Sequence, residues 1–336
     1  MLRRSWVMVA TALVSTLTAG QAAQPKPADA GTDTYTEQEI SFTSAGLKIP
    51  GTLCLPSAPP KGKPPIVVLV QGSGPHDRDE TVGAKKPFAD LAHGLAAHGI
   101  ATLRYDKRTV LEKPSNMDVV TMKWEVEDDA VAALEYARRV ARADSTKVFL
   151  LGHSLGAMLA PFIAAEPGAT PLAGLIMLAS PARPHLGYVD DQIRAMLQSE
   201  KKSDAEISAT IEKQHQLISD IEAGKLPPNQ VLQGAPVHYL REMIALDPAA
   251  KLRQESIPAL VLQGGKDAQV FEPDFNLLKE ALATRHIAGD ESKLFPELSH
   301  MFMTVAPGET GMAVYLRPGQ VAPEVIETIA RWIHAR

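Results

Sequence analysis

The sequence predicts an α/β protein, in which a mostly parallel, doubly wound sheet is covered by helices and a helical cap is inserted into the chain. Two observations support this fold class. Short apolar runs alternate with helical patterns along most of the chain, which is the order that parallel βαβ units require. From about residue 182 to 256 the alternation stops and the chain becomes helical and more polar, as expected for an inserted cap.

The first half of the chain supplies most of the predicted sheet. Residues 39–43 and 47–55 alternate in polarity around Ala45-Gly46 and favour an antiparallel hairpin. Continuous apolar runs are typical of strands buried on both faces, and helical spacing of apolar residues between them predicts the covering helices. We expect strands at residues 66–70, 101–105, 147–151 and 174–179, and helices at 87–98, 121–141 and 157–166.

In the second half, Ser203 and Glu206 have the spacing of a capping box, which predicts the start of a helix in the cap. Gly224 and Pro227-Pro228 end that helix. Strand–helix alternation then resumes. We expect strands at residues 259–262 and 293–295, and helices at 274–283 and 323–333.

The N-terminus is typical of an export signal. Arg3-Arg4 precedes an apolar stretch that is too short to span a bilayer comfortably, and small residues follow it. We expect a signal peptide over residues 1–22, a disordered leader over 23–36 and the α/β domain with its helical cap over 37–336. The protein is then exported, periplasmic or secreted, without stable membrane insertion. The alternative is an uncleaved membrane anchor.

Composition excludes some partners. The chain has 336 residues, 45% of them hydrophobic, which is ordinary for a globular protein with a sizeable core. Its net charge of -5, with no basic stripe carrying aromatic residues, argues against a nucleic-acid partner. Cys54 is the only cysteine, so no intramolecular disulfide can form.

The pentapeptide Gly152-His153-Ser154-Leu155-Gly156 lies between a predicted strand and a predicted helix. G-x-S-x-G in this context describes a nucleophile elbow, a strained turn that lifts the serine hydroxyl above the sheet edge. The flanking glycines let helix and strand approach closely. The alternative is an ordinary turn rich in small residues. We therefore expect Ser154 to be a nucleophile.

A serine nucleophile needs a histidine to take its proton and a carboxylate to orient that histidine. Asp267 and His300 each follow a predicted strand, at the sheet edge that presents Ser154, and the chain order Ser, Asp, His fits the fold. Rival acids and histidines lack this strand-end position. They are Asp247, Asp274, Asp290, His93, His98, His286 and His334.

Acyl transfer also needs hydrogen-bond donors for the oxyanion. We expect the backbone N–H of Leu155 to be one, because it follows the nucleophile. The other comes from the loop Gln71-Gly72-Ser73-Gly74-Pro75, where two glycines permit close approach of the backbone. Ser73 is favoured as the second donor, with Gly72 or Gly74 as alternatives. The loop could also be a tight turn only.

From about residue 39 onward the chain resembles the α/β-hydrolase-fold serine hydrolases. Residues 72–81 and 103–108 are similar to a bacterial subgroup of capped carboxylesterases, whose members are often labelled dienelactone-hydrolase-like or S33-peptidase-like. The resemblance implies the same roles for Ser154, Asp267 and His300. The chain departs from the pattern at Gln71-Gly72, where many members have His-Gly.

We therefore expect a serine hydrolase that cleaves a small-molecule carboxylic ester without a metal or cofactor. A peptidase or amidase of the proline-aminopeptidase type is one alternative, and its amine anchor could be Asp190, Asp191 or Glu242. A binding protein that has lost catalysis is another. The run His76-Asp77-Arg78-Asp79-Glu80 is expected to pair internally and shape the oxyanion loop rather than bind a metal. Cap residues such as Ile193, Met196, Leu197, Tyr239 and Met243 either roof the acyl pocket or pack the cap onto the core.

Overall fold

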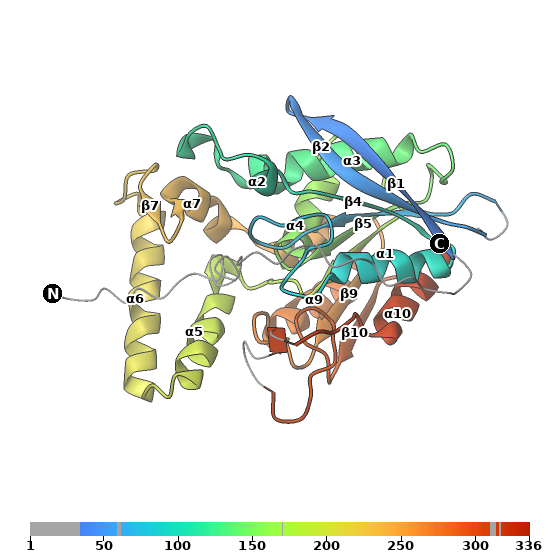
Figure 1. Ribbon diagram of the computed structural model, residues 1–336. Coiled ribbons are helices and arrows are strands. Elements are labelled where there is room, and N and C mark those ends of the chain that lie inside the picture. The colour runs from blue at the N-terminus through green and yellow to red at the C-terminus, as the bar shows by residue number, and fades with distance from the viewer. Residues whose placement is uncertain (1–33, 59–61, 170, 310–313, 316) are drawn as a thin grey trace.

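A computed structural model describes residues 34–336, apart from residues 59–61, 170, 310–313 and 316. A twisted sheet runs through the middle of the molecule with helices on both sides, and α5, α6 and α7 stand together beside one end of it (Figure 1). The predicted signal peptide and residues 23–33 of the predicted leader lie outside the described residues. The first strand already begins at Tyr35, so the last two residues of the predicted leader belong to the sheet.

The main sheet has eight strands and is mostly parallel. In spatial order they are β1 (Tyr35–Ser44), β2 (Leu47–Pro56), β4 (Ala101–Tyr105), β3 (Ile66–Val70), β5 (Val148–His153), β6 (Gly174–Leu178), β9 (Ala259–Gly264) and β10 (Glu291–Phe295). β1 pairs antiparallel with β2, as the hairpin predicted around Ala45-Gly46, and β2 pairs antiparallel with β4. The six strands from β4 to β10 therefore point their carboxyl ends to one edge.

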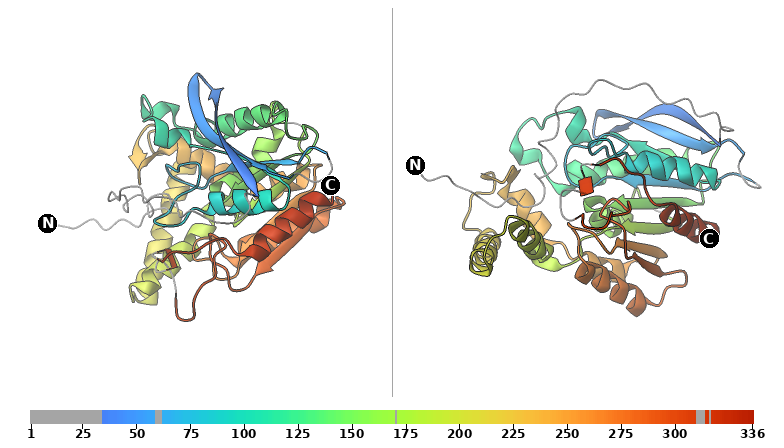
Figure 2. Two further views of the ribbon diagram at one scale, coloured as in Figure 1. Left: turned by 45° about the vertical axis from the view of Figure 1, so that its right-hand side comes forward. Right: turned by 60° about the horizontal axis from the view of Figure 1, so that its bottom comes forward.

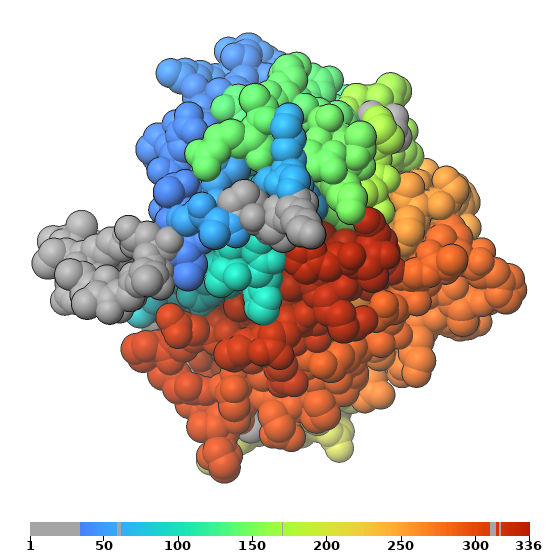
Figure 3. Space-filling view, turned by 90° about the vertical axis from the view of Figure 1, so that its right-hand side faces the viewer, coloured from blue at the N-terminus to red at the C-terminus, as the bar shows by residue number. Residues whose placement is uncertain are grey.

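The helices follow the strands along the chain. They are α1 (Pro87–Ala97), α2 (Arg108–Leu111), α3 (Asp128–Arg138), α4 (Leu155–Ala165), α5 (Tyr188–Ser199), α6 (Asp204–Glu222), α7 (Val237–Ala245), α8 (Pro248–Gln254), α9 (Glu272–Arg285) and α10 (Pro323–His334). Figure 3 shows α10, in dark red, in the middle of one face, between α1 in teal and the orange segment that holds α9 and β10.

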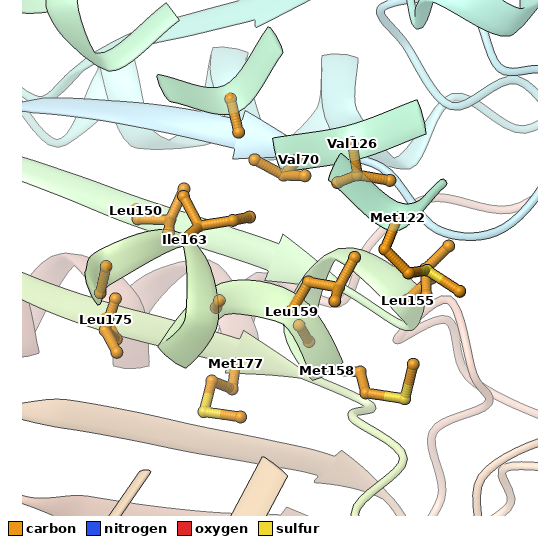
Figure 4. Packing of buried hydrophobic residues seen from close by; sticks show 14 of the residues in the cluster. Val70, Met122, Val126, Leu150, Leu155, Met158, Leu159, Ile163, Leu175 and Met177 are labelled. Atoms are coloured by element: carbon orange, nitrogen blue, oxygen red, sulfur yellow. The ribbon is translucent and has the colours of Figure 1, made fainter. Parts of the chain in front are cut away.

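Alternate residues of the central strands enter two separate cores, as the buried apolar runs require. Val68 and Val70 of β3 pack in the core formed with α3 and α4, whereas Val67 and Leu69 pack in the core formed with α1 and α10. In Figure 4, Val70, Leu150 and Leu175 from three neighbouring strands face residues of α4. The helices thus cover both faces of the sheet, and the α/β fold class is confirmed.

The helix predicted over residues 121–141 begins differently from expectation. A π-helical turn, Lys123–Glu127, precedes α3, and hydrogen bonds in such a turn span one residue more than in an α-helix. Glu125 lies buried in this turn. Periodicity arguments assume one helical repeat throughout, so they could not anticipate the wider turn.

The inserted segment contains α5, α6 and α7. Ser203 and Glu206 form the predicted capping box at the start of α6. A short hairpin, β7 (Val231–Leu232) with β8 (Ala235–Pro236), connects α6 to α7 and was not expected, because two-residue strands leave no periodic pattern. Figure 2 shows α5 and α6 side by side and away from the sheet. We call the part from α5 to α7 the helical insertion.

Cys54 of β2 lies buried beneath α1, with its Sγ 3.8 Å from the carbonyl oxygen of Ala92. Burial raises the pKa of this thiol to about 12. No helix among the described residues is long and apolar enough to cross a membrane.

Candidate active site

Ser154 occupies a strained turn between β5 and α4, with φ 53° and ψ -115°. A Cβ on Gly152 would lie 2.2 Å from the carbonyl oxygen of Gly156, and a Cβ on Gly156 would lie 2.3 Å from that of Val70. Only glycine fits at either position, because both obstacles are backbone atoms. The turn therefore has the geometry of a nucleophile elbow, in which a non-glycine residue keeps positive φ because its surroundings hold it there.

Asp267 and His300 meet at the same edge of the sheet. Asp267 follows β9, His300 follows β10, and His300 Nδ1 lies 2.8 Å from Asp267 Oδ2. The other carboxylate oxygen, Oδ1, accepts the backbone N–H groups of Gln269 at 2.8 Å and Val270 at 2.9 Å. An acceptor-only carboxylate requires a proton on Nδ1, which leaves His300 Nε2 for a reacting group.

Ser154 and His300 line one cavity of about 260 Å³. Among the described residues no hydrogen bond joins the Ser154 hydroxyl to His300, whose imidazole is fixed by Asp267 instead. Catalytic hydrogen bonds in ligand-free enzymes are often long and tighten when substrate binds. The arrangement thus brings the three predicted side chains to one sheet edge, with the serine and the histidine facing the same space.

The loop that follows β3 passes beside the elbow. A Cβ on Gly72 would lie 3.1 Å from the Ser154 Cβ, so glycine permits this approach. Ser73 and Leu155 both line the cavity. Leu155 is the first residue of α4, so its N–H has no partner within the helix. No described residue accepts a hydrogen bond from the Ser73 N–H. Two backbone donors are therefore available beside Ser154.

The walls of the cavity are largely apolar and come from both the sheet edge and the helical insertion. Tyr188 of α5 and Met243 of α7 line it together with Met158, Val270 and Met301. The cap residues named from the sequence divide between the two expected roles. Met243 lines the cavity, whereas Ile193, Leu197 and Tyr239 are buried in the core and Met196 packs against it.

A second buried pair, Glu80 with His153, lines the same cavity and was not predicted. His153 Nδ1 is 3.0 Å from both carboxylate oxygens of Glu80, and its Nε2 is 2.9 Å from the backbone carbonyl oxygen of His300. Because both nitrogens face acceptors, His153 is an imidazolium. Although burial lowers the pKa of His153, Glu80 and the His300 carbonyl raise it overall.

Glu80 also reaches the loop after β3. Its Oε1 accepts the Gly72 N–H at 2.6 Å. Although burial raises the pKa of Glu80, the neighbouring His153 and His76 and the Gly72 N–H lower it overall, so the carboxylate is ionised. The position of His153 beside the nucleophile was the only sequence signal for this pair, since its partner is 73 residues away in the chain.

The expected pairing within the run 76–80 holds only for hydrogen bonds, because the backbone N–H groups of Asp79 and Glu80 bind Asp77, whereas among these described residues no ion pair joins two members of the run. Arg78 binds Asp106 and Glu39, and Asp79 binds Arg104 and Lys86, all outside the run. The ionic partners lie on or beside distant strands, since Glu39 belongs to β1, Arg104 belongs to β4 and Asp106 follows β4. His76 and Glu80 do contact the oxyanion loop, as predicted.

The rival residues have other partners. Asp247 accepts the Ala250 N–H at the start of α8, Asp274 binds Arg183, and Asp290 binds Arg285. The rival histidines are likewise placed away from the cavity lining. Of these, His93 pairs with Glu37, His334 reaches the His98 carbonyl oxygen, and His286 follows α9 in the left-handed conformation. In the described part of the chain no cluster of His, Cys, Asp and Glu could hold a metal ion.

Comparison with known proteins places this site in a family. The model of the family described as serine aminopeptidase, S33, matches residues 67–304, which include the elbow, Asp267 and His300. The chain belongs to this family. A curated relative, Esterase EstD of Thermotoga maritima, is 36% identical over 296 residues, covering 88% of this chain and 67% of the relative. The family match and this esterase relative together assign this S33-family member to the carboxylic ester hydrolases.

Solved structures support the fold. Est1E from Butyrivibrio proteoclasticus covers 89% of this chain and 99% of its own, with a TM-score of 0.55 at 16% identity. An esterase of Pyrococcus furiosus covers 93% and 96%, with a TM-score of 0.55 at 13% identity. At such identities the likeness concerns the α/β-hydrolase fold alone.

Proposed function

We propose that this S33-family protein hydrolyses small carboxylic esters through an acyl-enzyme, with Ser154 as nucleophile, His300 as base and Asp267 as the acid that orients it. The observation that supports the proposal most is the buried 2.8 Å contact between Asp267 and His300 at the cavity that Ser154 lines. The strained elbow adds to it, because such strain persists only where the surrounding structure holds it.

The reaction proceeds in two halves. The Ser154 hydroxyl attacks the ester carbonyl carbon while His300 Nε2 takes its proton, and the backbone N–H groups of Leu155 and Ser73 bind the oxyanion. His300 then gives the proton to the departing alcohol. A water molecule, deprotonated by His300, attacks the acyl-enzyme, and His300 returns the proton to the Ser154 oxygen as the carboxylic acid leaves. Asp267 stabilises the imidazolium that forms in both halves.

The cavity favours a small substrate. Its volume of about 260 Å³ lies just below the range of roughly 300–1,000 Å³ that is usual for drug-sized ligands. Met158, Tyr188 and Met243 form an apolar wall suited to a short acyl chain. We therefore propose esters with short acyl groups as the preferred substrates.

Aminopeptidase activity is the second candidate, because it is the activity printed in the family's description. It requires a free carboxylate for the substrate amine. Of the three anchors expected from the sequence, Asp190 binds His215, Asp191 binds Arg183, and Glu242 accepts the Met122 N–H. None of these carboxylates lines the cavity, and Glu80, which does, is paired with His153. These pairings favour ester over peptide cleavage.

Turnover of nitrophenyl butyrate and of an aminoacyl anilide by the wild type and by Ser154→Ala tests the proposal. We expect the ester to be the better substrate. The substitution should lower kcat by roughly 10⁶-fold, as in hydrolases that lose this nucleophile. A fluorophosphonate probe should label the wild type and not the variant. Preference for the anilide would favour the peptidase, and failure to label Ser154 would favour a catalytically inactive binding protein.

A further inference from the structure

Three buried side chains hold three successive peptide groups of the loop after β3. Glu80 Oε1 accepts the Gly72 N–H at 2.6 Å, Lys107 Nζ donates to the Gly72 carbonyl oxygen at 2.9 Å, and His76 Nε2 lies 2.7 Å from the Ser73 carbonyl oxygen. Backbone loops are usually tied by backbone partners or water. Here the charged side chains of Glu80 and Lys107 and the imidazole of His76 contact the loop instead.

The Lys107 contact sets the direction of the Ser73 N–H. The Gly72 carbonyl and the Ser73 N–H belong to one planar trans peptide, so they point in opposite directions. With the carbonyl oxygen bound to Lys107 in the interior, the Ser73 N–H is turned away from Lys107, and Ser73 lines the cavity beside Ser154. Rotation of this peptide would aim the N–H elsewhere and would break the contact with Lys107.

Lys107 is itself held by a second residue. Its Nζ donates to Glu125 Oε1 at 2.5 Å, and the side chains of both residues are at least nine-tenths buried. An ammonium group out of contact with water keeps one position when its partners are fixed, because leaving them would expose an unpaired buried charge. Glu125 lies in the π-helical turn before α3, so this turn supplies the anchor for the lysine.

Glu125 connects the lysine to the helical insertion. Its second oxygen, Oε2, accepts the hydroxyl of Tyr239 in α7 at 2.6 Å. Two further bonds tie α7 to the same segment: Glu242 accepts the Met122 N–H, and His238 Nε2 lies 2.9 Å from the Val120 carbonyl oxygen. Since Met243 on α7 lines the cavity, one helix both shapes the substrate space and contacts the chain of groups that ends at Gly72.

We propose that Lys107 is a positioning residue for the oxyanion hole, held by Glu125 and by Tyr239 of the helical insertion, so that it aims the Ser73 N–H at the developing oxyanion. This inference rests on the proposed esterase reaction. It assigns the second donor to Ser73 rather than to Gly72, whose N–H is already bound to Glu80. It also makes transition-state stabilisation depend on where α7 sits.

Lys107→Met tests the proposal, because methionine keeps much of the side-chain volume and removes the ammonium. Removal of an oxyanion donor lowers kcat by roughly 10²–10³-fold, so misdirection of one donor should lower kcat by about 10–100-fold while KM stays within about twofold. A trifluoromethyl ketone that forms a tetrahedral adduct with Ser154 should lose affinity by the same factor as kcat. The matching methyl ketone, which binds without the oxyanion, should keep its affinity.

Arg108→Met is the matched control. Arg108 is the next residue, is equally buried and pairs with Asp129, but it does not contact the oxyanion loop. We expect this variant to lose thermal stability and to keep the wild-type kcat and ketone affinity. Equal kcat losses in both variants would show that any broken buried ion pair disturbs the site, and would overturn a specific role of Lys107.

Tyr239→Phe provides a second, milder variant that preserves the ring. It removes one hydrogen bond to Glu125 and leaves the Lys107–Glu125 pair, so kcat should fall about 2–10-fold, with the trifluoromethyl ketone affinity following it. Unchanged kcat in Lys107→Met, with an active wild type, would refute the positioning role alone. Unchanged kcat in Tyr239→Phe would refute the proposal that the helical insertion helps to hold Lys107. An inactive wild type would refute the proposed function instead.

Discussion

Replacement of Glu80 by glutamine should destabilise the protein in a pH-dependent manner. Glutamine can still accept the Gly72 N–H, but it carries no charge to balance the His153 imidazolium, which is buried and 3.0 Å away. Removal of one partner from a buried ion pair costs about 3–5 kcal/mol, because the other charge is left uncompensated. We expect a loss of about 3 kcal/mol in the free energy of unfolding, since His153 can relieve part of the cost by losing its proton.

The sign of the pH dependence follows from the two pKa shifts. The pKa of His153 is raised, so its contribution is complete below the unfolded value of 6.5 and is lost as pH rises through the folded value. The pKa of Glu80 is lowered, so its contribution is present above 4.5 and is lost as pH falls through the folded value. The ion pair therefore adds most to the free energy of unfolding of the wild type between pH 4.5 and 6.5.

Urea unfolding of the wild type and Glu80→Gln at about pH 5.5 and about pH 9 measures this effect, provided that both proteins unfold with the same slope. The difference in unfolding free energy should be largest at the lower pH and should shrink at the higher one. A difference that is the same at both pH values, or below about 1 kcal/mol at pH 5.5, would mean that the two groups do not form an ion pair.

Two further predictions concern the elbow and the acid. Asp267→Ala should lower kcat for nitrophenyl butyrate by roughly 10⁴-fold, less than Ser154→Ala, because the oxyanion donors and His300 remain; equal losses in steady-state assays would contradict a purely orienting role for Asp267. Gly156→Ala should lower the melting temperature strongly or prevent soluble expression, since its Cβ would lie 2.3 Å from the Val70 carbonyl oxygen; a variant with wild-type melting would contradict the close approach of α4 to β3.

The parts of the fold that sequence reasoning predicted are those with a local physical cause. The strands β3 and β5 could be predicted because both faces of each are covered, which requires continuous apolar residues. Asp267 and His300 could be predicted as candidate site residues because parallel strands bring their carboxyl ends to one edge of the sheet. Residues that are 33 positions apart in the chain therefore meet there. Their catalytic roles remain proposals, although the contact between them is now described.

The parts that escaped prediction depend on contacts between distant segments. Glu80 and His153 carry no local pattern, and Lys107 entered the sequence analysis only within residues 103–108, as part of a family resemblance. Its second partner lies 18 residues away, in a π-helical turn that no regular periodicity describes. Charged residues in such places look like surface residues in a sequence. Only the packed structure reveals that these ones are buried and paired.

The buried thiol of Cys54 has a practical consequence for studies of this protein. With a pKa of about 12 and no access to solvent, it does not form a reactive thiolate while β2 and α1 remain packed. Alkylation by iodoacetamide therefore requires that this region open first, and the labelling rate reports the frequency of that opening. A cysteine introduced at an exposed site would conversely accept a fluorophore alone, without removal of the native residue.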